Sequence, residues 1–135
     1  VVKACVPSGT ECVAKCDGAE AAADAAAGIL GSRRYDAVVV QEFVPGAEYI
    51  VDCVSLDGQH VVSAIWAVQK ASIGSDFAYD RKVTVPFTSE EGSVQRAVCD
   101  YVVQCLAALG VQTGASHTKV LCGGARGPCL VKACP

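Results

Sequence analysis

Lys3 is the first residue of the chain whose chemistry suggests a bound ligand. It lies on an apolar opening segment and is followed by a short loop that contains Ser8, Gly9 and Thr10. Small residues let backbone N–H groups approach a phosphate, and the lysine ammonium offsets the negative charge. A solvated lysine beside a turn has the same pattern, because short motifs of this kind match many unrelated sequences.

A second candidate site lies at the end of the apolar run 37–44 and in the turn after it. Gln41 and Glu42 lie toward the end of this run, a Pro45-Gly46 turn comes next, and Glu48 then supplies a carboxylate. A carboxylate at this place can accept hydrogen bonds from a pair of hydroxyl groups. An ordinary connection between two strands would contain the same residues.

The closing segment reads as a β-hairpin with a glycine-rich turn at 123–127. If Cys122 pairs with Cys129, then Lys119 lies directly opposite Lys132 on one face of the hairpin. Like charges placed directly opposite each other destabilise a sheet. We therefore expect an anionic group between the two lysines, unless the register differs from this one.

The composition limits the classes of protein to consider. The chain has 135 residues, of which 52% are hydrophobic and 19% charged, and its formal net charge is -3. It is apolar enough to fold as a globular domain, and it lacks the basic excess on which nucleic-acid binding relies. No apolar run approaches the roughly 18 residues that a membrane span needs.

Nine cysteines are spread along the chain, with no C-x-x-C pair. An odd number without such pairs supports neither a disulfide scaffold nor a zinc ribbon. Most of them lie in apolar strand or helix patterns, where a free cysteine behaves as a small buried hydrophobe. We expect them to be reduced and mostly buried in a cytoplasmic protein. The remaining metal hypothesis combines Cys12 and Cys16 with His60 or His117.

Periodicity and turn signals predict a mixed fold of the α+β class. A β-hairpin over 1–16 precedes an alanine-rich helix over 19–30, which Gly31 ends. The continuous apolar run 37–44 is typical of a strand covered on both faces. The first part of the chain therefore combines one helix with short strands.

The second part begins with a hairpin and ends with the lysine-bearing one. Asp57-Gly58 is a strong hairpin-turn signal between strands over 48–56 and 60–68. A loop over 74–79 and an extended segment over 80–87 follow. We expect the two hairpins to be antiparallel.

A long helix is predicted over 89–109. Ser89 or Thr88 would cap its start and Gly110 would stop it. Apolar residues recur within it at three- and four-residue steps, which indicates a buried face. The residues of that face are Val94, Val98, Tyr101, Val102, Cys105, Leu106 and Leu109.

Taken in chain order, these motifs resemble the ATP-grasp superfamily. The likeness rests on the opening Val-Val-Lys with its Ser/Gly loop, on Gln41-Glu42-Phe43-Val44-Pro45-Gly46-x-Glu48-Tyr49, on the His117-Thr118-x-Val120 strand, and on the closing Gly127-Pro128-Cys129-Leu130-Val131 strand. It runs over nearly all of the chain. It is strongest toward the stand-alone carboxylate-amine ligases, and D-alanine:D-alanine ligase and biotin carboxylase are more distantly similar.

The resemblance implies a nucleotide cleft between two α+β lobes with antiparallel sheets, a smaller lobe over 1–36 and a larger lobe over 37–135. Lys3 and the loop over 8–10 would contact the phosphates, the segment 41–44 would bond the adenine edge, and Glu48 would bind the ribose. The residues implied to bind the nucleotide are therefore Lys3, Ser8, Gly9, Thr10, Gln41, Glu42, Phe43, Val44 and Glu48.

The resemblance also implies a reaction. ATP phosphorylates a small carboxylate, and an amine attacks the acyl-phosphate to give an amide, ADP and phosphate. The superfamily's amino-terminal lobe, which helps to bind substrate, would be missing, so we expect this chain to be a fragment of a longer protein. No catalytic residue is implied.

The chain departs from the family where the family binds magnesium. Lys119 and Lys132 stand where the family pattern has carboxylates, and Cys134 stands where it often has asparagine. An ammonium group has three donors and no acceptor, so neither lysine can coordinate Mg²⁺. We therefore expect an ATP-binding domain with impaired ligase chemistry. The alternatives are a nucleotide- or anion-binding module without ligase turnover and a purely structural α+β domain.

Overall fold

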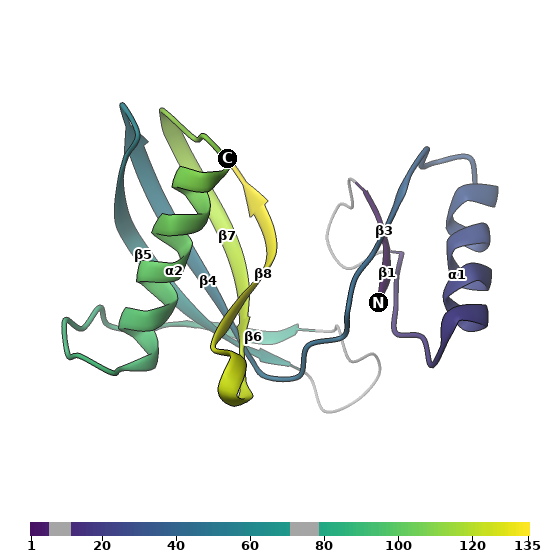
Figure 1. The fold of residues 1–135 in the computed structure, drawn as a ribbon, viewed down its shortest axis with the longest axis horizontal. Coiled ribbons are helices and arrows are strands. Elements are labelled where there is room, and N and C mark those ends of the chain that lie inside the picture. The colour runs from purple at the N-terminus through teal and green to yellow at the C-terminus, as the bar shows by residue number, and fades with distance from the viewer. Residues whose placement is uncertain (6–11, 71–78) are drawn as a thin grey trace. The chain divides into compact units, whose positions relative to one another are not determined.

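The chain folds into two compact units, each a sheet with one helix packed against it (Figure 1). This computed structural model describes residues 1–5, 12–70 and 79–135. Unit 1 is built mainly from Val1–Phe43, and unit 2 from Val44–Gln69 and Tyr79–Pro135. The expected mixed fold with antiparallel sheets is confirmed.

Unit 1 contains a three-stranded antiparallel sheet. Its strands are β1 (Val2–Ala4), β2 (Val13–Ala14) and β3 (Val38–Val40), in the order β2-β1-β3. Val2 pairs with Ala14, so the expected opening hairpin is present. The loop of that hairpin, over 6–11, lies outside the described residues.

Strand β3 differs from its prediction. The run 37–44 suggests a strand covered on both faces, yet only Val38–Val40 is a strand, and it lies at the edge of the unit 1 sheet. Its Val40 is 63% exposed. Because β3 makes its main-chain hydrogen bonds to β1, the two units divide between Phe43 and Val44 rather than after residue 36.

Helix α1 (Ala19–Gly31) agrees with its predicted range. Alanine fills most of the helix, and Ile29 is the residue that it buries. The core of unit 1 is correspondingly small, with Val2, Ala4 and Ile29 as its buried members. Alanine gives this helix its propensity but little apolar surface to bury.

Unit 2 contains a five-stranded sheet with helix α2 (Val94–Ala108) across one face (Figure 1). The strand order is β6-β5-β4-β7-β8. A 3₁₀ turn over Gly124–Arg126 joins the last two strands. The strands are β4 (Ala47–Leu56), β5 (Gln59–Lys70), β6 (Tyr79–Thr84), β7 (Gly114–Cys122) and β8 (Pro128–Cys134).

The β4–β5 hairpin confirms the Asp57-Gly58 signal. Both residues have positive φ, 49° and 77°, which is the backbone that a type I′ turn requires. Leu56 pairs with Gln59 directly across this turn. A register shift between Asp52 and Cys53 interrupts the hairpin farther along.

The unit 2 core lies between α2 and the sheet. Val98, Val102 and Leu106 of the predicted helix face are fully buried there. Val94 and Leu109, which were predicted to join them, are 44% and 58% exposed because they lie at the two ends of the helix. In the part of the chain that the structure describes, neither helix is long and apolar enough to cross a membrane.

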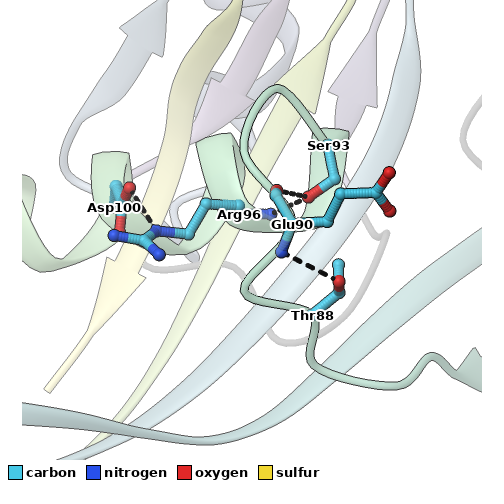
Figure 2. Close-up of polar contacts among 5 residues, drawn as sticks. All are labelled: Thr88, Glu90, Ser93, Arg96 and Asp100. Atoms are coloured by element: carbon cyan, nitrogen blue, oxygen red, sulfur yellow. Dashed lines mark hydrogen bonds and ion pairs between the residues drawn. The ribbon is translucent and has the colours of Figure 1, made fainter.

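Helix α2 begins at Val94, later than the predicted Ser89. Gly92 has φ 82°, a conformation outside the helical region, so the helix cannot extend through it. Ser93 is the N-cap, and its Oγ accepts a hydrogen bond from the Arg96 N–H at 3.2 Å (Figure 2). The capping chemistry was anticipated, but it was assigned to the wrong serine.

Thr88, the other expected cap, closes a separate turn before the helix. Its Oγ1 accepts a hydrogen bond from the Glu90 N–H at 3.1 Å (Figure 2). The Glu90 carbonyl in turn accepts a hydrogen bond from the Ser93 hydroxyl at 2.8 Å. Two short polar turns therefore occupy the positions where the sequence predicts the first helical turn.

The closing hairpin brings the two lysines together as expected, by a different register. Cys122 pairs with Pro128 and not with Cys129. A register shift next to Lys119 compensates for this difference of one residue, so that Lys119 still pairs with Lys132. The bulge therefore decides which side chains lie opposite each other.

Candidate ligand-binding face of unit 2

The sheet of unit 2 carries its polar chemistry on the face opposite α2. Side chains alternate along a strand, so Val51 of β4 and Val120 of β7 pack into the core, whereas their neighbours point to the other face. We call this other face the polar face. The polar residues that strands β4, β5, β7 and β8 place there include Glu48, Asp52, Trp66, His117, Lys119 and Lys132.

Glu48 and Lys119 form an ion pair on the polar face. Glu48 Oε1 lies 3.0 Å from Lys119 Nζ, and the side chains are 7% and 23% exposed. Leu121 is the direct cross-strand partner of Glu48, so Lys119 is its diagonal neighbour on β7. The anionic group expected beside the paired lysines is thus a carboxylate of the chain itself, contributed by β4.

Lys132 lies opposite Lys119 and is exposed. Within the described residues it forms no ion pair. Of the two paired lysines, Lys119 is therefore neutralised by Glu48, and Lys132 presents its charge to solvent.

Asp52 links a histidine and a tryptophan on the same face. Its Oδ1 lies 2.7 Å from His117 Nδ1, and its Oδ2 accepts a hydrogen bond from Trp66 Nε1–H at 2.7 Å. An ionised carboxylate only accepts, so this arrangement places the ring proton on Nδ1 and leaves Nε2 directed away from Asp52. The His117 side chain is 50% exposed.

Sequence reasoning did not find this Asp52 group. Asp52 and His117 are far apart in the chain and become neighbours only through the pairing of β4 with β7. Trp66 is brought in by the other neighbour of β4, strand β5. A prediction of the three-strand register, with its one-residue shift, would have been needed to find it.

The start of β4 is fixed by a close approach of two backbone segments. A Cβ on Gly46, whose φ is 152°, would lie 2.5 Å from the Cys122 carbonyl oxygen. A Cβ on Gly123 would lie 2.5 Å from the Pro45 carbonyl oxygen. Only glycine fits at either position, and the contact locks the beginning of β4, where Glu48 lies, against the end of β7.

The residues at the positions that the resemblance assigns to metal ligands do not fit magnesium. Lys119 pairs with Lys132, and Cys134 pairs with His117 in the next row. Mg²⁺ requires hard oxygen ligands, whereas these positions offer two ammonium groups and a thiol. Among residues 1–5, 12–70 and 79–135 no group of three or more histidine, cysteine, aspartate or glutamate side chains is arranged to hold a metal ion.

Lys3 lies on the central strand of unit 1. It pairs with Val13 on one side and Val39 on the other, and it is half-buried. Ser8, Gly9 and Thr10 lie outside the described residues.

The segment 41–44 contains the division between the two units. Gln41 anchors it to unit 1 through the main chain, because its N–H donates to the Val1 carbonyl at 2.8 Å and its carbonyl accepts from the terminal amine at 2.7 Å. Glu42 is exposed. The ring of Phe43, 39% exposed, lies under Lys15 Nζ at 4.2 Å. Val44, half-buried, is the first residue of unit 2.

The nine cysteines are all free, but the expectation that most are buried is wrong. Cys53 and Cys99 are buried, Cys5 is exposed, and the others are partly exposed. Burial in the unit 2 core raises the pKa of the Cys99 thiol to about 11, and the neighbouring Cys53 and Asp100 add to this shift. The other cysteines lie where the fold covers them incompletely, for example Cys105 on helix α2, Cys122 at the end of β7, and Cys129 and Cys134 on the edge strand β8.

The remaining zinc hypothesis is not supported by the described residues. Cys12 and Cys16 pack against the unit 1 core. His60 Nδ1 is hydrogen-bonded to Ser55 Oγ at 2.7 Å, and His117 Nδ1 to Asp52, both within unit 2.

No protein-family model and no curated protein sequence matches the chain. Solved structures do match it in fold. An L-amino acid ligase from Bacillus licheniformis superposes with a TM-score of 0.61 at 21% identity, over 77% of this chain and 26% of that one. A D-alanine--D-alanine ligase from Bacillus anthracis complexed with ATP gives a TM-score of 0.51 at 16% identity, over 71% and 29%.

A second structure of D-alanine--D-alanine ligase from Bacillus anthracis gives a TM-score of 0.54 at 16% identity, over 82% of this chain and 36% of that one. The chain thus spans 26 to 36% of the length of these three proteins. Identities this low show the fold alone. The likeness covers most of the chain, and the chain therefore has the ATP-grasp fold that these proteins share.

Proposed function

We propose that this chain is part of the ATP-binding domain of an ATP-dependent carboxylate-amine ligase. The observation that carries the proposal is the fold, which is shared with two kinds of ligase, one of them solved in complex with ATP. The order of the motifs along the chain supports the same reading. The domain would take a small carboxylate and an amine as substrates and would pass through an acyl-phosphate to an amide, ADP and phosphate.

The nucleotide-binding residues of this proposal are those that the resemblance to the superfamily implies. Lys3 and the loop over 8–10 serve the phosphates, the segment 41–44 serves the adenine, and Glu48 serves the ribose hydroxyls. Charge-assisted hydrogen bonds to phosphate are stronger than neutral ones, which favours Lys3 as the main contributor from unit 1.

The lysines of the polar face argue for impaired ligase turnover. Lys119 and Lys132 can hold phosphates as point charges. They cannot replace bridging metal ions, which align the attacking and leaving oxygens of an in-line phosphoryl transfer. The second candidate function is therefore a nucleotide- or anion-binding module without ligase turnover, favoured by the same two residues.

The wider setting is part of the proposal. A missing amino-terminal lobe of the same protein would be the partner that completes the substrate site. Nine free cysteines fit a reducing compartment, and we propose a cytoplasmic location on that ground.

Calorimetric titration with ATP and ADP tests nucleotide binding. We expect weak binding by the wild type and several-fold weaker binding by Lys3→Ala, because that variant loses a charged phosphate contact. Lys82→Ala, on the exposed outer strand β6, is the charge-matched control and should bind as the wild type does. Equal heats for wild type and Lys3→Ala, or no heat for any protein, would remove the nucleotide-binding claim.

A further inference from the structure

The Glu48–Lys119 pair bears on which part of a nucleotide the polar face can hold. Glu48 is 7% exposed, and its Oε1 lies 3.0 Å from the Lys119 ammonium. In the proposed function the same carboxylate serves the ribose hydroxyls. A carboxylate that is already paired with an ammonium must give up that pair, or share it, before it accepts hydrogen bonds from a ligand.

Separating the two groups is unfavourable at this site. Removing the partner of a largely buried charge leaves that charge without compensation, which is among the more costly changes in a protein. A hydroxyl pair is neutral and replaces an ammonium poorly. Glu48 should therefore stay with Lys119 when a ligand binds.

We propose that Lys119 is a specificity-determining residue. Its ion pair with Glu48 prevents that carboxylate from binding the ligand. The polar face therefore binds a polyphosphate chain with similar affinity whether or not a nucleoside is attached. The inference rests on the proposed function for its premise that this face meets the phosphates, and it replaces the ribose role that the proposed function gives to Glu48.

The other charges of the polar face agree with a polyphosphate ligand. Its second carboxylate, Asp52, is engaged with His117 and Trp66 at 2.7 Å each. Both carboxylates are thus held by groups of the chain, and Lys132 is the exposed cation opposite Lys119. An ammonium binds a phosphate oxyanion as a point charge and needs no divalent cation to do so.

Titration with tripolyphosphate and with ATP, both without divalent cations, separates the phosphate from the nucleoside. In the wild type we expect the two dissociation constants to agree within about three-fold, a difference of less than about 1 kcal/mol. In Lys119→Met we expect ATP to gain about tenfold over tripolyphosphate, because a freed carboxylate can accept from the ribose. Lys132→Met is the matched control, and it should weaken both ligands by the same factor.

Glu48→Gln provides a second test that leaves Lys119 in place. If Glu48 bound the ribose, this variant should weaken ATP and leave tripolyphosphate unchanged, whereas the ratio of the two affinities should not change if Lys119 keeps Glu48 from the ligand. If Lys119→Met does not fold, as judged by circular dichroism, the result for Glu48→Gln alone tests the inference. An ATP preference of tenfold or more in the wild type that Glu48→Gln abolishes would overturn the inference.

Two further results would also count against it. Equal weakening of both ligands by Lys119→Met would show that Lys119 acts on the phosphates without affecting the choice of nucleoside, which would overturn the inference while leaving the proposed function intact. Absence of binding of either ligand to every protein would overturn the proposed function and the inference together.

Discussion

The two units share one plan, a sheet with a helix against it, but they differ in what they bury. In unit 2, Ile65, Val102 and Leu106 are almost completely buried between α2 and the sheet. In unit 1, α1 contributes mainly alanine, and Ile29 is its buried residue. Full burial of a large aliphatic side chain contributes about 1.5–3 kcal/mol, and alanine contributes far less. Unit 2 should therefore be the more stable of the two.

The same contrast holds for the candidate binding residues. In unit 2, paired and hydrogen-bonded side chains such as Glu48 and Asp52 stand on strands whose other face is a packed core. In unit 1, Gln41 is held through its main chain. A well-packed sheet keeps its polar side chains in a defined arrangement, so the candidate residues of the polar face are held more rigidly than Gln41.

The core of unit 2 provides the largest expected effect. Leu106→Ala should lower the free energy of unfolding of unit 2 by about 2–5 kcal/mol, since it leaves a cavity under the sheet. Urea denaturation followed by fluorescence of Trp66, the single tryptophan and a unit 2 residue, measures this. Ile29→Ala is the control in unit 1, and an equal shift of the tryptophan transition by that variant would show that the units do not unfold separately.

Thiol labelling compares the two units at a chemical level. Cys5 of unit 1 is exposed, whereas Cys99 of unit 2 is buried with its pKa raised from 9.0 to about 11. A rise of about two pKa units lowers the thiolate fraction of Cys99 about a hundred-fold below pH 9. Cys5 should therefore label at least about a hundred-fold faster at pH 8, as measured by mass spectrometry of peptides. The Cys99 rate should increase as the pH rises, and similar native rates for both thiols would contradict the buried position.

The hydrogen bonds of Asp52 have a smaller expected effect. Asp52→Asn should destabilise unit 2 by about 1–2 kcal/mol, because it weakens charge-assisted bonds to His117 and Trp66. Asp80→Asn is the matched control, since the Asp80–Arg81 pair is exposed and such pairs contribute about 0–1 kcal/mol. If both variants shift the urea transition equally, the Asp52 group is no more than a surface contact.

The helix cap gives the smallest effect. Ser93→Ala should cost about 1 kcal/mol, the usual effect of losing an N-cap hydrogen bond. Ser89→Ala, at the predicted cap position, should change the unfolding free energy by no more than a few tenths of a kcal/mol. A larger loss of unfolding free energy for Ser89→Ala than for Ser93→Ala in urea denaturation would indicate that α2 begins at Ser89, as the sequence predicts.

Features with local causes could be predicted from the sequence. The Asp57-Gly58 turn was found because both residues tolerate positive φ, and α1 was found because alanine has the highest helix propensity. The Lys119–Lys132 pairing was also predicted, but from a register that is wrong by one residue at the turn, and the bulge beside Lys119 restores the pairing.

Features that depend on non-local pairing could not be predicted. Strand β3 pairs with β1 of unit 1, and nothing in its own sequence specifies this partner. The Asp52 group needs the β4–β5 and β4–β7 registers together. Prediction of the Glu48–Lys119 pair requires the β4–β7 register as well. The sequence therefore predicted an anionic group beside the lysines but did not identify Glu48 as that group.

The central claim is that lysines at positions 119 and 132 make the polar face accept phosphate without a divalent cation. Calorimetric ATP titration with and without Mg²⁺, in the wild type and in the Lys119→Glu/Lys132→Glu double variant, tests it most directly. The wild type should bind ATP at least as tightly without Mg²⁺, because the ion neutralises the phosphates that the lysines attract. The double variant should need Mg²⁺ before it binds ATP, since carboxylates are the ligands this ion requires. If ATP affinity responds to Mg²⁺ in the same way in both proteins, the account is contradicted, because residues 119 and 132 would then lie outside the phosphate site.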